Sequence, residues 1–345
     1  MKKVALIVDV DNWAYANIAN NFKKNLSQFY DITVIPTAYL DDNITKTFLV
    51  LEDCDLVHIF WRGKLLTFDL EFNDYYLKKL GLTKQEFIDR YIKNKIITTA
   101  VYDHLYLDEE NLNKTKSIVK KADAYYVSSE RLFKIYNELD LPKKPTTVIT
   151  DGVDLNKFYP LNEERYKNIK NREIVIGWCG NSLWEAGTED FKGVNTILKP
   201  AIKELNEEGY KIKTYFADKQ ERMIPHNKMN DYYSNIDIYI CTSKIEGTPN
   251  PVLESMAAGI PIISTDVGIV PELFGEKQKE YILKERSKDE LKKKLRKMID
   301  NIDKIDELRQ ENLKEIEDWT WKKISYKMKK FLDERFVNET NKDYS

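Results

Sequence analysis

Short apolar runs alternate with polar stretches of helix length along most of the chain. In the first 150 residues, six runs rich in Val, Ile and Tyr are expected to be β-strands: 4–8, 32–36, 56–60, 96–101, 124–128 and 147–150. Several of them lack the polar–apolar alternation of a half-solvated strand, which is typical of parallel strands buried on both faces. Helix-like segments lie between them, so the pattern predicts repeated strand–helix–strand units.

The second half repeats this scheme. Strands are expected at 174–179, 211–217, 236–241, 260–264 and 281–283, and helices at 194–208, 229–233, 251–258 and 287–302. One or two closing helices are expected over 313–336. We therefore predict an α/β protein of two doubly wound domains that face each other across a cleft. In such sheets, ligands bind outside the carboxyl ends of the strands.

The boundary between the two halves is placed by the run Asp151-Gly-Val-Asp154 and the polar stretch 162–172 that follows it. We expect an N-terminal Rossmann-like domain over 1–160 and a C-terminal one over 161–318. Residues 319–345 are expected to form a helix that packs back toward the first domain and ends in a frayed tail.

Charge and composition exclude several classes of protein. The 345 residues carry a formal net charge of −2, with no overall basic field, so nucleic acid is not an expected partner. Three widely spaced cysteines, Cys54, Cys179 and Cys241, argue against a disulfide framework and a structural zinc site. The apolar run after Met1 stops at Asp9, which is too short for a secretory signal, and no window approaches 18 apolar residues.

A cytoplasmic setting is therefore expected. The basic and aromatic segment 319–326 leaves two interpretations of the last helix open. It is either a packed helix with a solvated lysine face or a helix that makes peripheral contact with the inner membrane surface.

The most informative stretch is Glu246-Gly-Thr-Pro-Asn-Pro-Val-Leu-Glu254, which follows a predicted buried strand. Asn250 suits the N-cap of a short helix and Pro251 its first position. Gly259 suits the left-handed residue after the helix, and Pro261 prevents its continuation. The helix start therefore points out of the carboxyl edge of a sheet.

A helix start of this kind binds phosphate. Proline lacks an N–H group, so the cradle is expected to use the amides of Thr248, Asn250, Val252 and Leu253. Glu246 and Glu254 flank it, and carboxylates accept hydrogen bonds from hydroxyl groups. An anion cradle between two hydroxyl-binding carboxylates suits a sugar nucleotide, with the diphosphate at the helix start.

This motif and its surroundings resemble the retaining glycosyltransferases of family 4, the "group 1" transferases of GT-B fold. Besides the two glutamates, the resemblance is carried by the following segments: 150–160, 174–180, 238–243, 255–259, 261–265 and 266–273. It covers residues 147–275, whereas the first half matches mainly in its strand pattern. The resemblance implies the GT-B fold, with two Rossmann-like domains facing across a cleft.

The resemblance also implies roles for single residues. Glu254 would hold the ribose hydroxyls of the nucleotide and Glu246 would contact the donor sugar. Lys192, before Gly193, would bind the diphosphate. The family's phosphate-binding Arg would fall near Asn181, where this chain has none, so Lys192 acts alone or Arg62 or Arg131 reaches across the cleft. The implied donor-binding set is Asn181, Lys192, Glu246, Gly247, Thr248, Asn250, Val252, Leu253 and Glu254.

In the first half, His104 follows a strand at a point where the family often has a histidine beside the donor sugar. The implied catalytic set is thus His104, Lys192 and Glu246. A structural role stays open for His104 and a solvated one for Lys192, while His58 and His226 are expected to be structural. Many family members have a Gly-rich loop after the first strand; here Asp11, Asn12 and Trp13 stand in its place and are expected on the acceptor side.

The implied function is retaining, metal-independent transfer of a sugar from a nucleoside-diphosphate sugar to a hydroxyl of a polysaccharide, glycolipid or protein glycan. No cofactor and no metal site are expected. Two alternatives share the fold: a sugar-nucleotide-binding protein without turnover and a sugar-nucleotide epimerase. A third rests on Asp9-Val-Asp11, which resembles the nucleophile strand of haloacid-dehalogenase-type phosphatases but lacks their Gly-Thr continuation.

Overall fold

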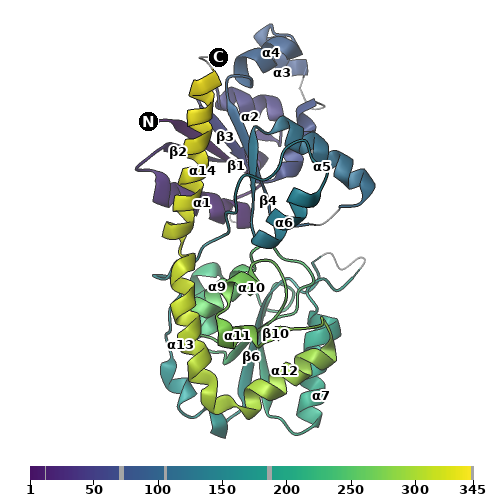
Figure 1. The fold of residues 1–345 in the computed structure, drawn as a ribbon, viewed down its shortest axis with the longest axis vertical. Coiled ribbons are helices and arrows are strands. Elements are labelled where there is room, and N and C mark those ends of the chain that lie inside the picture. Colours follow the sequence, from purple (N-terminus) through teal and green to yellow (C-terminus); the bar gives the residue numbers. More distant parts are fainter. Residues whose placement is uncertain (12, 70–73, 105–106, 185–188, 343–345) are drawn as a thin grey trace. The chain divides into compact units, whose positions relative to one another are not determined.

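The computed structural model describes residues 1–342 except 12, 70–73, 105–106 and 185–188 (Figure 1). The chain divides into two compact units, one made of residues 1–151 and 321–345 and the other of residues 152–320. The division lies nine residues before the boundary expected after residue 160. The polar stretch expected as a linker instead forms two 3-10 turns of the second unit, Glu163–Tyr166 and Ile169–Asn171, and buries Tyr166 and Ile169 in its core.

The first unit is built on a five-stranded parallel sheet in the order β2-β1-β3-β4-β5. Its strands are β1 (Lys3–Val8), β2 (Asp31–Pro36), β3 (Leu56–Ile59), β4 (Ile96–Val101) and β5 (Ala124–Val127). The expected strand at 147–150 is reduced to one parallel bridge, between Val148 and Val127. The Val127 amide donates to the Thr147 carbonyl at 3.2 Å and the Ile149 amide donates to the Val127 carbonyl at 2.9 Å, so the segment runs beside β5 without forming a full strand.

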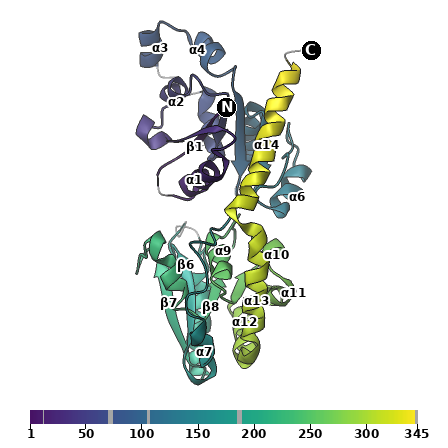
Figure 2. The same cartoon turned by 90° about the vertical axis from the view of Figure 1, so that its left-hand side faces the viewer.

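Helices connect these strands and cover the sheet. They are α1 (Ala14–Leu26), α2 (Ile44–Val50), α3 (Asp74–Leu80), α4 (Lys84–Tyr91), α5 (Glu109–Lys121) and α6 (Glu130–Glu138), with 3-10 turns at Thr37–Leu40 and Arg62–Asp69. The last helix of the chain, α14 (Trp321–Lys342), belongs to this unit and lies along α1 (Figures 1 and 2). Trp321 meets the Phe22 ring edge-on at 5.7 Å, and Phe331 meets Tyr126 at 5.5 Å.

The outer face of α14 is polar. Its exposed positions carry Lys322, Lys323, Lys327 and Lys330, together with Tyr326 at 68% exposure. Within the part of the chain that the structure describes, no helix has both the length and the apolar character needed to cross a membrane.

The second unit has a parallel sheet in the order β10-β9-β8-β6-β7. Its strands are β6 (Ile174–Gly180), β7 (Ile212–Asp218), β8 (Ile238–Cys241), β9 (Ile262–Thr265) and β10 (Ile282–Leu283). Its helices are α7 (Lys199–Glu207), preceded by a π-turn at Val194–Leu198, α8 (Met229–Tyr233), α9 (Asn250–Ala257), α10 (Val270–Leu273), α11 (Glu276–Lys279), α12 (Lys288–Asp300) and α13 (Ile305–Glu315), with 3-10 turns at His226–Lys228, Ile302–Lys304 and Ile316–Trp319. One continuous apolar core joins sheet and helices.

A buried ion cluster ties the amino ends of β6 and β8 together. The Asp237 side chain, with no exposed surface, accepts from Arg165 Nε at 2.8 Å and from two guanidinium nitrogens of Arg172 at 2.7 Å each. It also accepts from the backbone N–H of Val175, the second residue of β6, at 2.7 Å. Both carboxylate oxygens are thus fully used, so this buried charge is compensated.

Replacing Asp237 should therefore unfold the second unit readily. Asp237→Ala leaves two guanidinium groups without their partner, and we expect the free energy of unfolding to fall by about 3–5 kcal/mol. The matched control is Asp231→Ala, an exposed carboxylate 3.7 Å from Lys228, which should change it by less than about 0.5 kcal/mol. Urea unfolding followed by circular dichroism measures both, and equal midpoints for the two variants would contradict the prediction.

Candidate functional site

The helix α9 starts at the carboxyl edge of the second sheet, directly after the loop that follows β8. The expected N-cap was one residue off: Asn250 is already the first helical residue and Pro249 occupies the cap position. The expected end is confirmed, because Gly259 has φ +69° and the amides of Gly259 and Ile260 bond back to the carbonyls of Met256 and Ser255 at 2.9 Å each. This is a Schellman ending.

The loop before α9 is held by a close approach of two glycines. The Ile269 amide donates to the Gly247 carbonyl at 3.1 Å, and Gly268 has φ +49°. A Cβ atom placed on Gly268 would lie 2.0 Å from the Gly247 oxygen. Residue 268 must therefore lack a side chain for the loop that carries Glu246 to take this course.

Lys192 and Glu246 form an ion pair. The Lys192 Nζ lies 2.6 Å from Glu246 Oε1, and the side chains are 19% and 20% exposed. The ammonium also lies 5.0 Å from the centre of the Trp184 ring, a cation–π contact. Two residues with separate roles in the sequence analysis, one for phosphate and one for the donor sugar, are thus in direct contact.

Asp190 shapes the loop that presents Lys192. Its carboxylate accepts from the backbone amides of three residues at the start of the following helical segment, at 2.8–2.9 Å: Gly193, Asn195 and Thr196. Gly193 has φ +67°, and a Cβ there would lie 2.6 Å from the carbonyl oxygen of Thr242. The Lys-Gly pair therefore fits against the end of β8 only with glycine at 193.

Arg286, on the loop after β10, joins two neighbouring loops. Its guanidinium donates to the carbonyl of Thr242 at 2.9 Å and to the carbonyls of Asp190 and Phe191. Burial lowers the pKa of Arg286. The three carbonyls accept from its Nε and Nη2 atoms, and its Nη1 atom lies 3.8 Å from Glu189 Oε1. This arginine holds the loops in place rather than reaching outward.

Glu254, in the second turn of α9, is 13% exposed and has a donor at each oxygen. The Tyr233 hydroxyl donates to Oε2 at 2.7 Å, and His226 Nε2 lies 3.2 Å from Oε1. On its other side His226 Nδ1 lies 2.8 Å from the Nζ of Lys157. Sequence reasoning missed all three partners, and it assigned His226 a purely structural role. Lys157 lies in the family-like segment 150–160, but no sequence signal links it to His226 or Tyr233, because the three residues lie on segments that only the fold brings together.

The four amides expected in the cradle lie at or just before the start of α9. One of them, the Val252 amide, donates to the Pro249 carbonyl at 2.8 Å. The side chains of Val252 and Leu253 are fully buried. Asn181 lies at the end of β6, where its Oδ1 accepts from Gln220 at 2.7 Å and from the Leu183 amide at 3.1 Å. Asn181 thus orders the turn after β6.

The remaining predicted residues lie in the first unit. Asp11 is exposed and accepts from the Tyr39 hydroxyl at 2.6 Å, and Trp13 is 63% exposed at the start of α1. Asn12 lies outside the described residues. His104 follows β4, and its pKa is lowered, mainly by partial burial, which favours the neutral ring at pH 7. Arg62 is engaged within this unit, 3.0 Å from Asp103.

Metal-binding clusters and thiol nucleophiles are two further kinds of site that an α/β protein can carry. The described residues hold no group of three or more His, Cys, Asp or Glu side chains suited to a metal ion. Burial raises the pKa of the Cys179 thiol, at the end of β6, to about 12, so it is no nucleophile.

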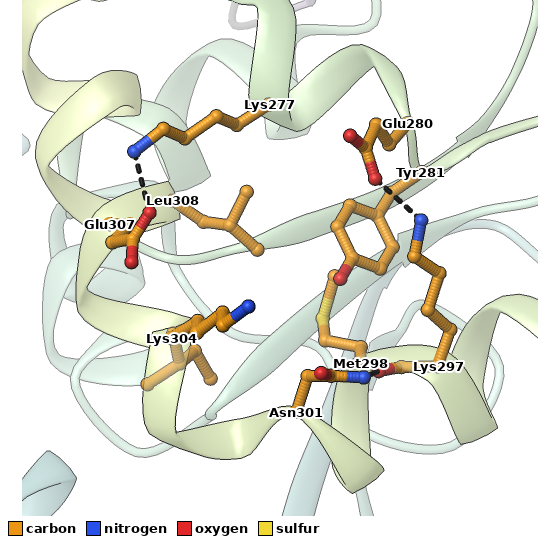
Figure 3. Close-up of a pocket in the computed structure, with 10 residues that line it drawn as sticks. Lys277, Glu280, Tyr281, Lys297, Met298, Asn301, Lys304, Glu307 and Leu308 are labelled. Carbon is orange, nitrogen blue, oxygen red and sulfur yellow. Dashed lines mark hydrogen bonds and ion pairs between the residues drawn. The ribbon is translucent and has the colours of Figure 1, made fainter.

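A separate cavity of about 290 Å³ lies between α11, α12 and α13 (Figure 3). It opens beside Tyr281, at the amino end of β10, which is the sheet edge opposite to Lys192, Glu246 and Glu254. Its rim lysines Lys277 and Lys297 are paired with Glu307 and Glu280. None of the residues discussed above lines it.

Comparison with known proteins finds glycosyltransferases that are similar to the second unit. Residues 192–315 match the family model described as "Glycosyl transferases group 1". The segment runs from Lys192 through both glutamates. Among curated proteins, the putative teichuronic acid biosynthesis glycosyltransferase TuaC of Bacillus subtilis is 27% identical over 142 residues, 39% of this chain and 36% of that protein. The lipopolysaccharide core biosynthesis mannosyltransferase LpsB of Rhizobium meliloti is 24% identical over 180 residues, 46% of this chain and 50% of that protein. The chain thus spans half or less of the length of these two relatives.

Solved structures match the chain over nearly its full length. Anabaena Alr3699/HepE in complex with UDP and glucose has a TM-score of 0.69 at 12% identity, covering 97% of this chain and 100% of that one. Sucrose-phosphate synthase from Thermosynechococcus elongatus has a TM-score of 0.66 at 15% identity, covering 98% and 100%. The fold is therefore GT-B, as the sequence predicted.

The glycine contact gives a test of the loop geometry. Gly268→Ala should destabilise the protein by more than the ~1–2 kcal/mol of left-handed backbone strain, because its Cβ also meets the Gly247 carbonyl. Gly81→Ala is the control, since Gly81 has φ +67° and nothing within 4 Å of its Cβ position. Urea unfolding compares them. Equal losses of stability would mean that the loop carrying Glu246 moves aside at little cost.

Proposed function

We propose that the protein is a retaining, metal-independent glycosyltransferase that moves a sugar from a nucleoside-diphosphate sugar to a hydroxyl acceptor. The observation that carries the proposal is the set of charged groups at one sheet edge: Glu254 on α9, and Glu246 paired with Lys192 beside it. Hydroxyl-binding carboxylates around a cation and a helix start match the three parts of such a donor: ribose, diphosphate and sugar.

In this proposal Glu254 accepts from the ribose hydroxyls and Glu246 from a hydroxyl of the transferred sugar. Lys192 exchanges its contact with Glu246 for the diphosphate. The donor's charge grows as the sugar departs, so a cation at 19% exposure stabilises the transition state more than the ground state. The complex of HepE with UDP and glucose supports a nucleoside diphosphate as the ligand class.

The transfer step breaks the bond between the anomeric carbon and the diphosphate oxygen and forms one to the acceptor oxygen on the same face. The acceptor proton passes to the departing diphosphate, which leaves as the nucleoside diphosphate. Lys192 and the start of α9 supply the positive charge that a divalent ion would otherwise provide. The acceptor is proposed to be a growing glycan, since curated relatives are named for teichuronic acid, lipopolysaccharide core and O-antigen biosynthesis. In the first unit, we propose His104 as a catalytic residue and Asp11 and Trp13 as residues on the acceptor side.

Replacing each glutamate in turn should affect nucleotide affinity differently. Glu254→Gln should weaken binding of the free nucleoside diphosphate roughly 10- to 150-fold, because a charge-assisted hydrogen bond to the ribose is lost. Glu246→Gln should leave that affinity unchanged or tighter, since the sugar is absent and Lys192 is released. Calorimetry with UDP, GDP and ADP measures this. The proposal fails if none of the three binds, and the division of roles fails if both variants lose affinity equally.

A transfer assay distinguishes the proposed glycosyltransferase from the alternative functions. With the sugar nucleotide of the base that binds, transfer should continue unchanged in excess EDTA, and NMR of the product should show the anomeric configuration of the donor. Glu246→Gln should lower kcat strongly in this assay. Activity that is lost with chelator and restored by Mg²⁺ or Mn²⁺ would refute metal independence, and an inverted product would refute retention. Binding without any transfer or hydrolysis would favour the non-catalytic alternative.

A further inference from the structure

The carboxylate of Glu254 is fixed from two sides. The Tyr233 hydroxyl at 2.7 Å holds Oε2, and its ring has no exposed surface and packs against Phe158 at 6.0 Å. Burial and the neighbouring Glu254 keep the pKa of Tyr233 well above its ordinary value, so the hydroxyl stays protonated and donates. On the other side, His226 Nε2 lies 3.2 Å from Oε1.

The direction of the His226 contact follows from Lys157. A lysine ammonium has only donors, so at 2.8 Å the Nδ1 of His226 must accept from it. The ring proton is then on Nε2, which donates to Glu254. The order of donation runs from Lys157 through His226 to Glu254, and it defines the tautomer of the ring by its neighbours. We call Lys157, His226 and Tyr233 the Glu254 relay.

The contacts of the Glu254 relay decide which lone-pair positions of the Glu254 carboxylate can still accept a hydrogen bond. A carboxylate has about four lone-pair positions, two on each oxygen. The protein fills one on Oε1 and one on Oε2. As far as the described part of the chain goes, one acceptor position on each oxygen is left, and the carboxylate cannot rotate without losing two donors. Two fixed, adjacent acceptors match the two hydroxyls of a vicinal diol.

We propose that the Glu254 relay positions this carboxylate for the 2′,3′-diol of a ribose and thereby makes the site discriminate ribonucleotides from 2′-deoxyribonucleotides. Lys157, His226 and Tyr233 are positioning residues, because they act through Glu254. The inference rests on the proposed nucleotide site. It adds a determinant of specificity, which a freely rotating carboxylate would lack because it could follow the single remaining hydroxyl.

His226 is the residue to change. Its side chain is 52% exposed, whereas Tyr233 is buried in the core, so a substitution at 226 disturbs the packing less than one at 233. His226→Leu removes both polar contacts of the ring and keeps an apolar group beside Phe158, whose ring centre lies 5.8 Å from that of His226. His226→Gln is the conservative rescue, because its amide oxygen can accept from Lys157 and its NH₂ group can donate to Glu254. Lys228→Ala, on the same 3-10 turn and paired with Asp231, is the matched control.

The experiment is calorimetry of the full chain with UDP, GDP and ADP and their 2′-deoxy forms. For the base that binds, the native protein should prefer the ribonucleotide by roughly 10- to 150-fold, the range of one charge-assisted hydrogen bond. His226→Leu should reduce this ratio of affinities to near one, mainly by weakening the binding of the ribonucleotide. His226→Gln and Lys228→Ala should keep it. Circular dichroism confirms that the variants are folded.

Each other outcome overturns the inference in its own way. If no nucleotide binds the native protein, the proposed function fails and the relay with it. If the native protein binds but does not discriminate, or if His226→Leu still discriminates, only the relay fails. If His226→Leu lowers the affinity for the ribonucleotide and for its 2′-deoxy form equally, His226 contacts the nucleotide directly and does not act through Glu254.

Discussion

Every residue of the candidate donor site depends on the parallel course of the second sheet. Because all five strands run the same way, the loops after β6, β8 and β10 open at one edge although they are far apart in sequence. Backbone groups in such loops need partners that the sheet does not supply. Arg286 provides them for three carbonyls, and Asp190 provides them for three amides. The loops are therefore ordered by half-buried polar side chains, and Lys192 and Glu246 are held on them.

The charges of the site balance one another in the absence of a ligand. Glu246 is neutralised by Lys192, and Glu254 accepts from a tyrosine and a histidine that is itself bonded to a lysine. Partly buried carboxylates require such partners, since an uncompensated charge would be costly. In the proposed complex only the contact between Lys192 and Glu246 is exchanged, because the ligand brings an anionic group for the first and a hydroxyl group for the second. Glu254 keeps its two donors, so its charge stays compensated in either state.

Sequence patterns predicted the elements well where they depend on local chemistry. The strand 96–101 and the helix 229–233 were predicted with their observed bounds, and Gly259 ends α9 as expected. The full strand predicted at 147–150 did not form, because strand pairing depends on the tertiary structure and not on the local sequence alone. The same reason hid the partners of Glu254. His226 lies in no motif. Lys157 lies in the family-like segment 150–160, but nothing in that segment indicates its partner, because the relation of both residues to Glu254 exists only once β8 and α9 have folded against the turn at 226–228. The clash that fixes Gly268 was equally invisible, since it involves a carbonyl 21 residues away.

The placement of α14 has a consequence for how the chain is made. The second unit is continuous in sequence, but the core of the first unit is completed by Trp321, Ile324, Met328, Phe331 and Leu332. During synthesis, the apolar faces of α1 and of the first sheet that receive these side chains wait until the last helix has left the ribosome. The second unit has all of its strands and helices at that moment. The order of maturation is therefore the reverse of the order of translation, with the first unit finished last.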